Sequence, residues 1–384
     1  AAGAATIAVV FATEPTAKRS GAVRQTPMLV DVVEVARGTH RPTLVAMGTV
    51  EAAEDVVLRP RVAGQVVARA PAFTPGGFVS AGQTLLRIDP ADYETILQQR
   101  LGELHQAEAD LQLEMGRQNV AQLDYEVLAE DLGDQNEALV LREPQLLATR
   151  ARVEAARAAV RRAELDLERT RITVPFDAHV LSREVAVGSQ VAAGEALGRL
   201  VGVDHYWVVA TVQRSERLWI GVPASPDGRG SPVEIHDRAA WPAGVIRTGH
   251  VTSEVGALDD RTRMARLLVT VPDPLARDEA SGDMPALTLG AFVEARITGR
   301  EIADVVRLPR DLIRQDDTVW VMRDEQLEIR DVDIVLRDDT HAYVRSGLED
   351  GDLVVTTNLA TVRDGAPLRL TAEQAMSADD EATP

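Results

Sequence analysis

Two stretches of the chain, residues 59–89 and 174–201, repeat one pattern. Gly76 aligns with Gly188 and Gly82 with Gly194, an offset of 112 residues (188 − 76 and 194 − 82). Each stretch reads as a strand, a glycine turn, the motif V-x-A-G-x-x-L and a second strand. A half of about 30 residues is too small to hold a core of its own. The two halves are therefore predicted to close one small β-sandwich together.

The segment between the halves is predicted to be helical, because it is rich in Leu, Ala, Glu, Gln and Arg. In its second part, apolar residues recur every seven positions, which predicts a coiled-coil seam: Leu146, Val153, Val160 and Leu167. In its first part, apolar residues follow four-three spacing and continue after a phase shift: Leu97, Leu101, Leu104, Leu111, Met115, then Val120, Leu123 and Val127.

A break between these two parts predicts an antiparallel helical hairpin. Residues 131–136 are rich in Asp, Gly and Asn, which are turn and cap residues, so the first arm is expected over 92–131. Pro144 disfavours a helix interior. The second helix therefore either begins near Glu143 or is bent in its first turns.

Composition excludes many kinds of chemistry. The chain has no cysteine, and its one lysine, Lys18, lies in a segment predicted to be a flexible linker. Disulfides, thiolate metal sites, Schiff bases and a P-loop lysine thus have no candidate in the folded body. The histidines show no metal-ligand spacing, so we predict no catalytic residue, no metal and no cofactor. A formal charge of −19 argues against nucleic-acid binding.

The two ends of the chain have their own patterns. Residues 1–12 carry no charge and are too few to span a bilayer, so they are interpreted as the end of an export signal or of an N-terminal anchor. Residues 373–384 are predicted to be a disordered tail.

A split β-module with a coiled-coil hairpin inserted in it resembles the periplasmic adaptor proteins of the HlyD-like family. These are also called membrane fusion proteins, and the resemblance is to the form that serves resistance-nodulation-division (RND) efflux pumps. It covers about residues 28–372, and LLRIDPADY at 85–93 is typical of the family. Further motifs agree with the resemblance: DHYWVVATVQRSERLWI at 204–220, Asp259 to Arg263, Gly290 to Val293 and Gly347 to Asp352.

The resemblance implies an elongated multidomain fold of mixed α and β structure, in which the chain runs out through four domains and returns through them. The expected segments are 1–27 as anchor or signal remnant and linker, 28–39 with 301–372 as membrane-proximal β domain, 40–55 with 204–300 as β-barrel, 56–90 with 172–203 as lipoyl-like sandwich, 91–171 as α-helical hairpin, and 373–384 as tail.

The resemblance also implies a function. The chain is expected to be a non-enzymatic adaptor in the periplasm, held at the inner membrane by its N-terminus. It would link an RND transporter to an outer-membrane channel of the TolC type and self-associate as a hexamer or a trimer of dimers. Two alternatives remain open: an adaptor of an ABC-type exporter, and a stand-alone structural coiled-coil protein. A swinging-arm lipoyl carrier is excluded, because it needs a lysine where this chain has the hairpin.

The functional surface is expected at the outer face and tip of the hairpin, since a heptad seam is used for self-packing. The candidate docking residues are Leu132, Gly133, Asp134, Gln135, Asn136 and Arg142. Many adaptors carry the tip motif R-x-x-x-L-x-x-x-x-x-x-S. Arg142 and Leu146 match its first two positions, but Val153 stands in place of the serine.

Overall fold

The computed structural model of the chain describes residues 27–128, 133–225, 228–278, 281–282, 284–359 and 363–371. The predicted anchor segment and the predicted tail lie outside these residues. The chain divides into two compact units. Unit 1 holds the residues up to 46, those from 212 to 222 and those from 296 onward, while unit 2 holds 47–211 and 223–295. The predicted fold class is confirmed: a helical hairpin, sandwich sheets, a closed six-stranded barrel and further β sheets.

Two four-stranded sheets of unit 2 contain strands from both halves of the repeat. The first sheet has the order β5 (Asp55–Leu58), β12 (Gly198–Gly202), β10 (Ala178–Arg183), β7 (Phe78–Val79). The second has the order β11 (Gln190–Val191), β6 (Gly64–Arg69), β8 (Thr84–Ile88), β9 (Arg171–Thr173). Each sheet takes two strands from each side of the insert, so neither half can form a sheet of this size alone.

The repeated glycines join the two halves. Gly76 and Gly188 have φ of +84° and +92°, and Gly82 and Gly194 have +75° and +85°. Each of their N–H groups donates to a carbonyl of the opposite half. The bonds are Gly76 to Val180 (2.9 Å), Gly188 to Val66 (2.8 Å), Gly82 to Val174 (2.7 Å) and Gly194 to Pro60 (2.8 Å). The sequence repeat is therefore a symmetric exchange of hydrogen bonds between the halves.

Residues at equivalent positions of the two halves form the core of this sandwich. The residues aligned by the repeat are buried alike: Val79 with Val191, Leu85 with Leu197, and Ile88 with Leu200. Phe73 belongs to the same core and is fully buried. With few aromatic residues available, aliphatic side chains from both halves supply most of the apolar surface that stabilises the module.

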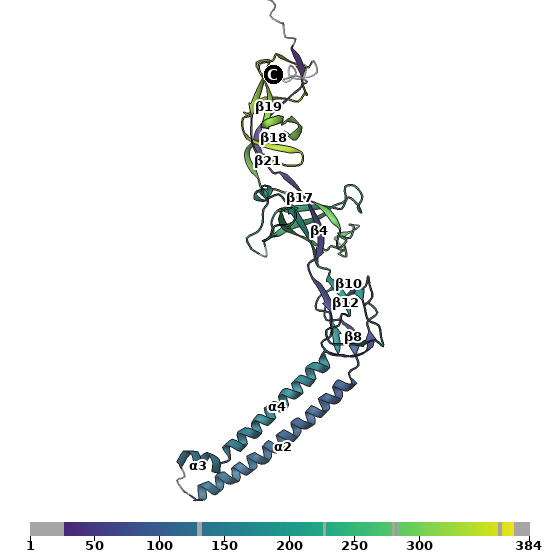
Figure 1. Cartoon of the computed structure of the whole chain (residues 1–384), viewed down its shortest axis with the longest axis vertical. Coiled ribbons are helices and arrows are strands. Elements are labelled where there is room, and N and C mark those ends of the chain that lie inside the picture. The colour runs from purple at the N-terminus through teal and green to yellow at the C-terminus, as the bar shows by residue number, and fades with distance from the viewer. Residues whose placement is uncertain are drawn as a thin grey trace, which may run out of the picture. The chain divides into compact units, whose positions relative to one another are not determined.

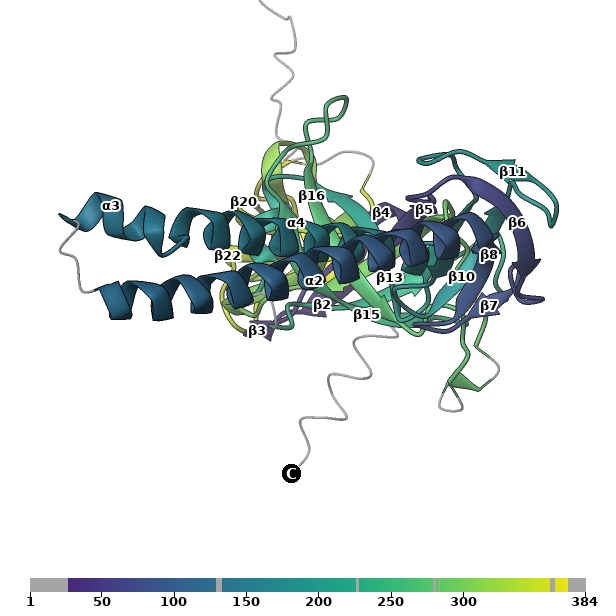
Figure 2. The same ribbon diagram turned by 90° about the horizontal axis from the view of Figure 1, so that it is seen from below.

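The hairpin consists of three helices, α2 (Ala91–Leu128), α3 (Gly133–Val140) and α4 (Glu143–Glu168). At 1.5 Å per residue, the 38 residues of α2 extend about 57 Å. The arms α2 and α4 run side by side, with α3 at the far end (Figures 1 and 2). At the base, the Tyr93 hydroxyl donates to the Ala63 carbonyl at 2.7 Å, which ties α2 to the sandwich. None of the described helices is long and apolar enough to cross a membrane.

A closed barrel follows the sandwich in the returning chain. Its strands, in barrel order, are β13 (His205–Val212), β16 (Ala265–Pro272), β15 (Arg247–Val255), β14 (Pro232–His236), β17 (Phe292–Thr298) and β4 (Thr43–Ala52). Alternate residues of β16 are buried, as a strand with one face in a core requires. Closure pairs every strand on both sides and leaves no free edge.

Unit 1 contains three open sheets in which early and late parts of the chain pair. Their orders are β21 (Asp333–Arg337), β22 (His341–Ser346), β18 (Ile302–Pro309), β3 (Arg37–His40); then β2 (Val32–Glu34), β23 (Leu353–Val355), β19 (Thr318–Arg323), β20 (Gln326–Asp331); and the pair β1 (Met28–Val30), β24 (Leu368–Leu370). Short 3-10 turns are η1 (Glu216–Trp219), η3 (Arg310–Leu312) and η4 (Gln315–Asp317).

Candidate partner-docking surface

The heptad seam predicted for the second arm is confirmed. Leu146, Val153, Val160 and Ala163 are buried in α4, with Leu167 partly buried. Leu146 and Val153 are thus packing residues. They occupy the second and last positions of the adaptor tip motif, so at these two positions the chain uses its side chains for self-packing.

On α2 the predicted seam is wrong beyond Leu111. The seam continues through Glu114, which is only 5% exposed, while Met115, the predicted seam residue, is exposed. Further along, Ala121 and Tyr125 are partly buried. The pattern advances by three residues at this point instead of four, which turns the following apolar residues outward.

An ion pair holds Glu114 in the seam. Arg142 Nε donates to Glu114 Oε1 at 2.7 Å, and Arg117 Nη1 lies 3.4 Å from Oε2. The hydrogen bond from Arg142 lowers the pKa of Glu114, and the same bond raises the pKa of Arg142. A second pair, Arg157 Nη2 to Glu108 Oε1 at 3.1 Å, joins the arms nearer the base. The two arms are therefore fixed in register by charge as well as by packing.

Arg142 also marks the break in the second arm. Its φ is +59°, in the left-handed region, and it stands immediately before α4. The helix α4 begins at Glu143, which confirms the expectation for the second arm. Pro144 stands at its second position, where a proline is tolerated. The preceding residues form the separate helix α3, whose last turn ends with the Leu141 N–H donating to the Glu137 carbonyl at 2.9 Å.

Besides Met115, four further apolar side chains are exposed on this part of α2, Leu113, Val120, Leu123 and Val127, and we call these four the outer apolar lane. Three of them are seven residues apart, and at 100° per residue such positions lie about 20° from one another on the helix. Exposure rises toward the end of the helix, from 58% at Val120 to 83% at Val127. Large exposed apolar surfaces of this kind mark interaction sites in soluble proteins.

Three more apolar residues are exposed on the second arm near its break. Leu139 and Val140 lie at the end of α3, and Leu147 lies in the second turn of α4. Together with the outer apolar lane, they place exposed apolar side chains on both arms of the distal half of the hairpin. The prediction that Val120, Leu123 and Val127 continue the seam is therefore wrong, and the phase shift after Met115 is the sequence signal for their change of face.

The predicted tip residues have different outcomes. Leu132 lies outside the described residues. Gly133, Asp134, Gln135 and Asn136 lie in the first half of α3, so the turn predicted at these four positions is wrong. Arg142 is described, but its guanidinium is used in the ion pair with Glu114.

The described part of the chain contains no group of three or more histidine, aspartate or glutamate side chains that is placed to hold a metal ion. Asp338 is a buried carboxylate, and the Tyr343 hydroxyl donates to it at 2.6 Å. The Asp338 carboxylate also accepts from the backbone N–H groups of Thr340 and His341, which close the β21–β22 turn. The Asp338 carboxylate therefore stabilises this turn.

Comparison with known proteins gives relatives over most of the chain. The family model described as RND MFP, barrel-sandwich hybrid domain matches residues 54–202. Multidrug resistance protein MdtA of Klebsiella pneumoniae subsp. pneumoniae is 29% identical over 333 residues, covering 85% of this chain and 76% of that protein. Multidrug resistance protein MdtA of Escherichia coli is 28% identical over 347 residues, covering 88% and 79%.

Two solved structures share the fold. The crystal structure of MacA from Actinobacillus actinomycetemcomitans matches with a TM-score of 0.58 at 19% identity, covering 85% of this chain and 99% of that one. A MacA-MexA chimeric protein, which contains the α-hairpin domain of Pseudomonas aeruginosa MexA, matches with a TM-score of 0.58 at 20% identity, covering 85% and 100%.

Proposed function

The chain belongs to the membrane fusion proteins of RND efflux systems, which are non-enzymatic periplasmic adaptors, and on this premise we propose that its cargo is drugs or other toxic small molecules. The relatives named multidrug resistance protein support this choice of cargo. Its partners are an inner-membrane RND transporter and an outer-membrane channel, and we propose that the channel is of the TolC type.

The observation that carries the adaptor function is the way the hairpin is mounted. Both ends of the inserted hairpin enter one sandwich, whose sheets mix strands from before and after the insert. The sandwich at the base of the hairpin is therefore held together by the chain segments that precede and follow the hairpin. A long arm on a rigid base is suited to bridging two partners that lie at a distance from each other.

Transport across the periplasm gives a reason for several copies of the chain to associate. A transporter driven in the inner membrane releases its cargo into the periplasm unless the path to the outer membrane is enclosed. One chain cannot enclose a path, so we propose that several copies do so together, as a hexamer or a trimer of dimers.

We propose that the outer apolar lane and the exposed residues Leu139, Val140 and Leu147 take part in docking on the channel, together with the tip residues 132–136. Exposed apolar side chains gain about 25 cal/mol for each Å² that a partner removes from water. Arg142 would act indirectly, because its bond to Glu114 holds the two arms that carry this surface.

For localisation in the periplasm we propose attachment to the inner membrane through residues 1–12. Membrane fractionation of cells that express the chain with these residues, or with a cleavable export signal in their place, tests this. The anchor proposal requires that the shortened protein be recovered in the soluble periplasmic fraction.

The function is tested by deleting the gene in its host and restoring it with tagged variants. We expect Val120→Asp and Leu123→Asp to lose drug resistance and co-purification of the channel, while co-purification of the transporter persists. The matched control is Ile96→Asp, which replaces an exposed residue of α2 near the base and should restore resistance. Recovery of an ATP-binding transporter instead of an RND protein would contradict the proposed power source.

A further inference from the structure

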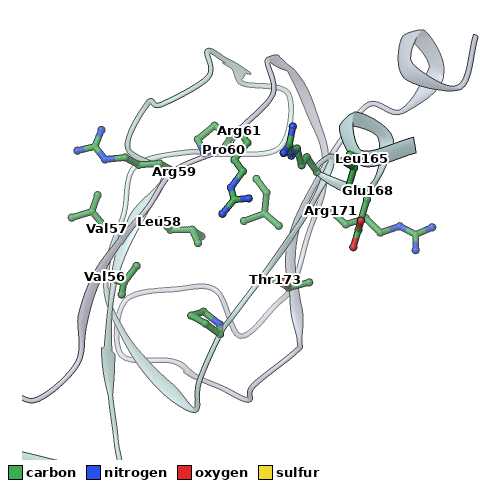
Figure 3. A pocket seen from close by; sticks show the side chains of 13 residues that line it. Val56, Val57, Leu58, Arg59, Pro60, Arg61, Leu165, Glu168, Arg171 and Thr173 are labelled. Carbon is green, nitrogen blue, oxygen red and sulfur yellow. The ribbon is translucent and has the colours of Figure 1, made fainter. Parts of the chain in front are cut away.

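A hollow of about 490 Å³ lies within unit 2, where the end of α4 meets the sandwich (Figure 3). One wall is formed by residues 56–61, which comprise most of β5 and the turn after it, and the other by Leu165 and the residues leading into β9. Its volume falls in the range of about 300–1,000 Å³ that is usual for small-molecule sites. The proposed docking surface on the hairpin does not use any of these residues.

The apolar part of the lining is exposed to solvent. Leu165 is 47% exposed and Val57 is 42% exposed, although both border a concave surface. Leu58 and Ile172, which also line the hollow, are buried. A ligand with an apolar body would remove this surface from water, which favours binding.

The charged part of the lining is basic in an otherwise acidic chain. Four arginines and one glutamate border the hollow, against a formal charge of −19 for the whole chain: Arg59, Arg61, Arg169, Arg171 and Glu168. A local excess of arginine in such a chain opposes the repulsion that an anion would otherwise meet.

Two of the four arginines already have a partner within the protein. Arg59 Nη1 donates to the Gly194 carbonyl at 2.6 Å, and Arg169 Nη1 pairs with Asp166 at 2.9 Å. Arg61 has no carboxylate partner among the described residues. Figure 3 shows the Arg61 side chain pointing into the hollow, whereas those of Arg59 and Arg171 point away from it.

We propose that this hollow binds an amphipathic organic anion, with its apolar body against Val57 and Leu165 and its acid group on Arg61. The planar guanidinium matches a carboxylate or sulfonate with two parallel hydrogen bonds. A cation would be repelled, and a purely polar anion would leave the apolar wall in water. A neutral apolar molecule would cover Arg61 and leave its charge unpaired, which is costly.

The test uses the purified full chain and two fluorescent probes of nearly the same shape. Anilinonaphthalene sulfonate carries the acid group, and N-phenylnaphthylamine lacks it. Arg61→Gln should weaken binding of the sulfonate about ten-fold or more, as loss of a charge-assisted bond predicts, while the neutral probe should bind no more weakly than before, because it no longer covers an unpaired charge. Leu165→Ala should weaken both probes. Circular dichroism of each variant confirms that the fold is retained.

The matched control is Arg171→Gln, which removes the same charge from a side chain that points away from the hollow. It should leave the affinity for the sulfonate close to that of the unchanged chain. The proposal is overturned if Arg61→Gln leaves sulfonate binding unaltered, or if it weakens both probes equally. An equal effect of Arg171→Gln and Arg61→Gln would also overturn it, because general charge would then explain the binding. No transporter or channel is needed, so the result is independent of the proposed cargo.

Discussion

Replacing either Gly82 or Gly194 by alanine is expected to loosen both halves of the sandwich to the same degree. At both positions a new Cβ would meet no atom within 4 Å, so crowding contributes nothing. The remaining cost is the strain of a left-handed backbone, about 1–2 kcal/mol for a residue with a Cβ. This corresponds to a factor of about 5–30 in the opening equilibrium.

Hydrogen–deuterium exchange of the purified chain measures this opening locally. Gly82 bonds to Val174, and Gly194 bonds to Pro60, so each glycine stabilises a segment of the opposite half. Each variant should therefore speed exchange about 5–30-fold in both 59–89 and 174–201. Acceleration confined to the half that carries the substitution would refute the exchange of hydrogen bonds as the link between the halves.

Gly77→Ala provides a contrast. Its new Cβ would lie 2.1 Å from the Ala72 carbonyl oxygen, so the backbone has to move. This variant should open the sandwich more than either Gly82→Ala or Gly194→Ala, and a milder effect would show that the turn before β7 is less constrained than its geometry implies.

Three further outcomes are expected. Leu200→Ala, at a fully buried site, should lower the free energy of unfolding of the sandwich by about 2–5 kcal/mol, and Leu165→Ala, at a half-exposed site, by less than about 1 kcal/mol, both measured by thermal and denaturant unfolding. Glu114→Gln should lower the melting temperature of the hairpin helices, followed by circular dichroism. Because Arg142 lowers the pKa of Glu114, this stabilisation is present above the ordinary glutamate value of about 4.3 and is lost as the pH falls through the lower folded value, so the two proteins should converge in acid. Gly102→Ala, at an open site within α2, should stabilise that helix by about 1 kcal/mol, and a lower melting temperature would contradict this.

The sandwich was predictable because its signal is duplicated. The glycine spacing and the alternating apolar residues agree between the halves, and each of them has a local cause in backbone conformation or strand burial. The aligned residues Val79 and Val191 are indeed buried together, and the aligned glycines share their left-handed φ.

The hairpin seam was predictable only where apolar residues form it. Beyond Leu111 the seam contains Glu114. A buried carboxylate cannot be predicted from the spacing of apolar residues. Its position depends on Arg142, which is far away in sequence and comes close only once the hairpin has formed. The apolar pattern therefore places Met115, Val120, Leu123 and Val127 in the seam, although all four are exposed.

The tip was the least predictable part. Residues 133–136 combine Gly, Asp, Gln and Asn, which locally favour a turn, yet they form the start of α3. Helix propensities of these residue types differ from that of alanine by only about 1 kcal/mol or less per residue, so they do not fix the conformation by themselves. Pro144, by contrast, acts through a fixed ring, and the helix boundary that it predicts is correct.

The exchange of hydrogen bonds between the halves has a consequence for the order of folding. When the first half leaves the ribosome, its partners Val174 and Val180 have not been made, so its strand edges stay unpaired until the whole insert has been synthesised. Local contacts let the hairpin zip up early. Zipping brings the ends of an intervening segment of about 80 residues together, which reduces the closure cost of the sandwich by about 2–3 kcal/mol relative to an unstructured loop. The arm that would later reach toward a partner thus first assembles the base on which it stands.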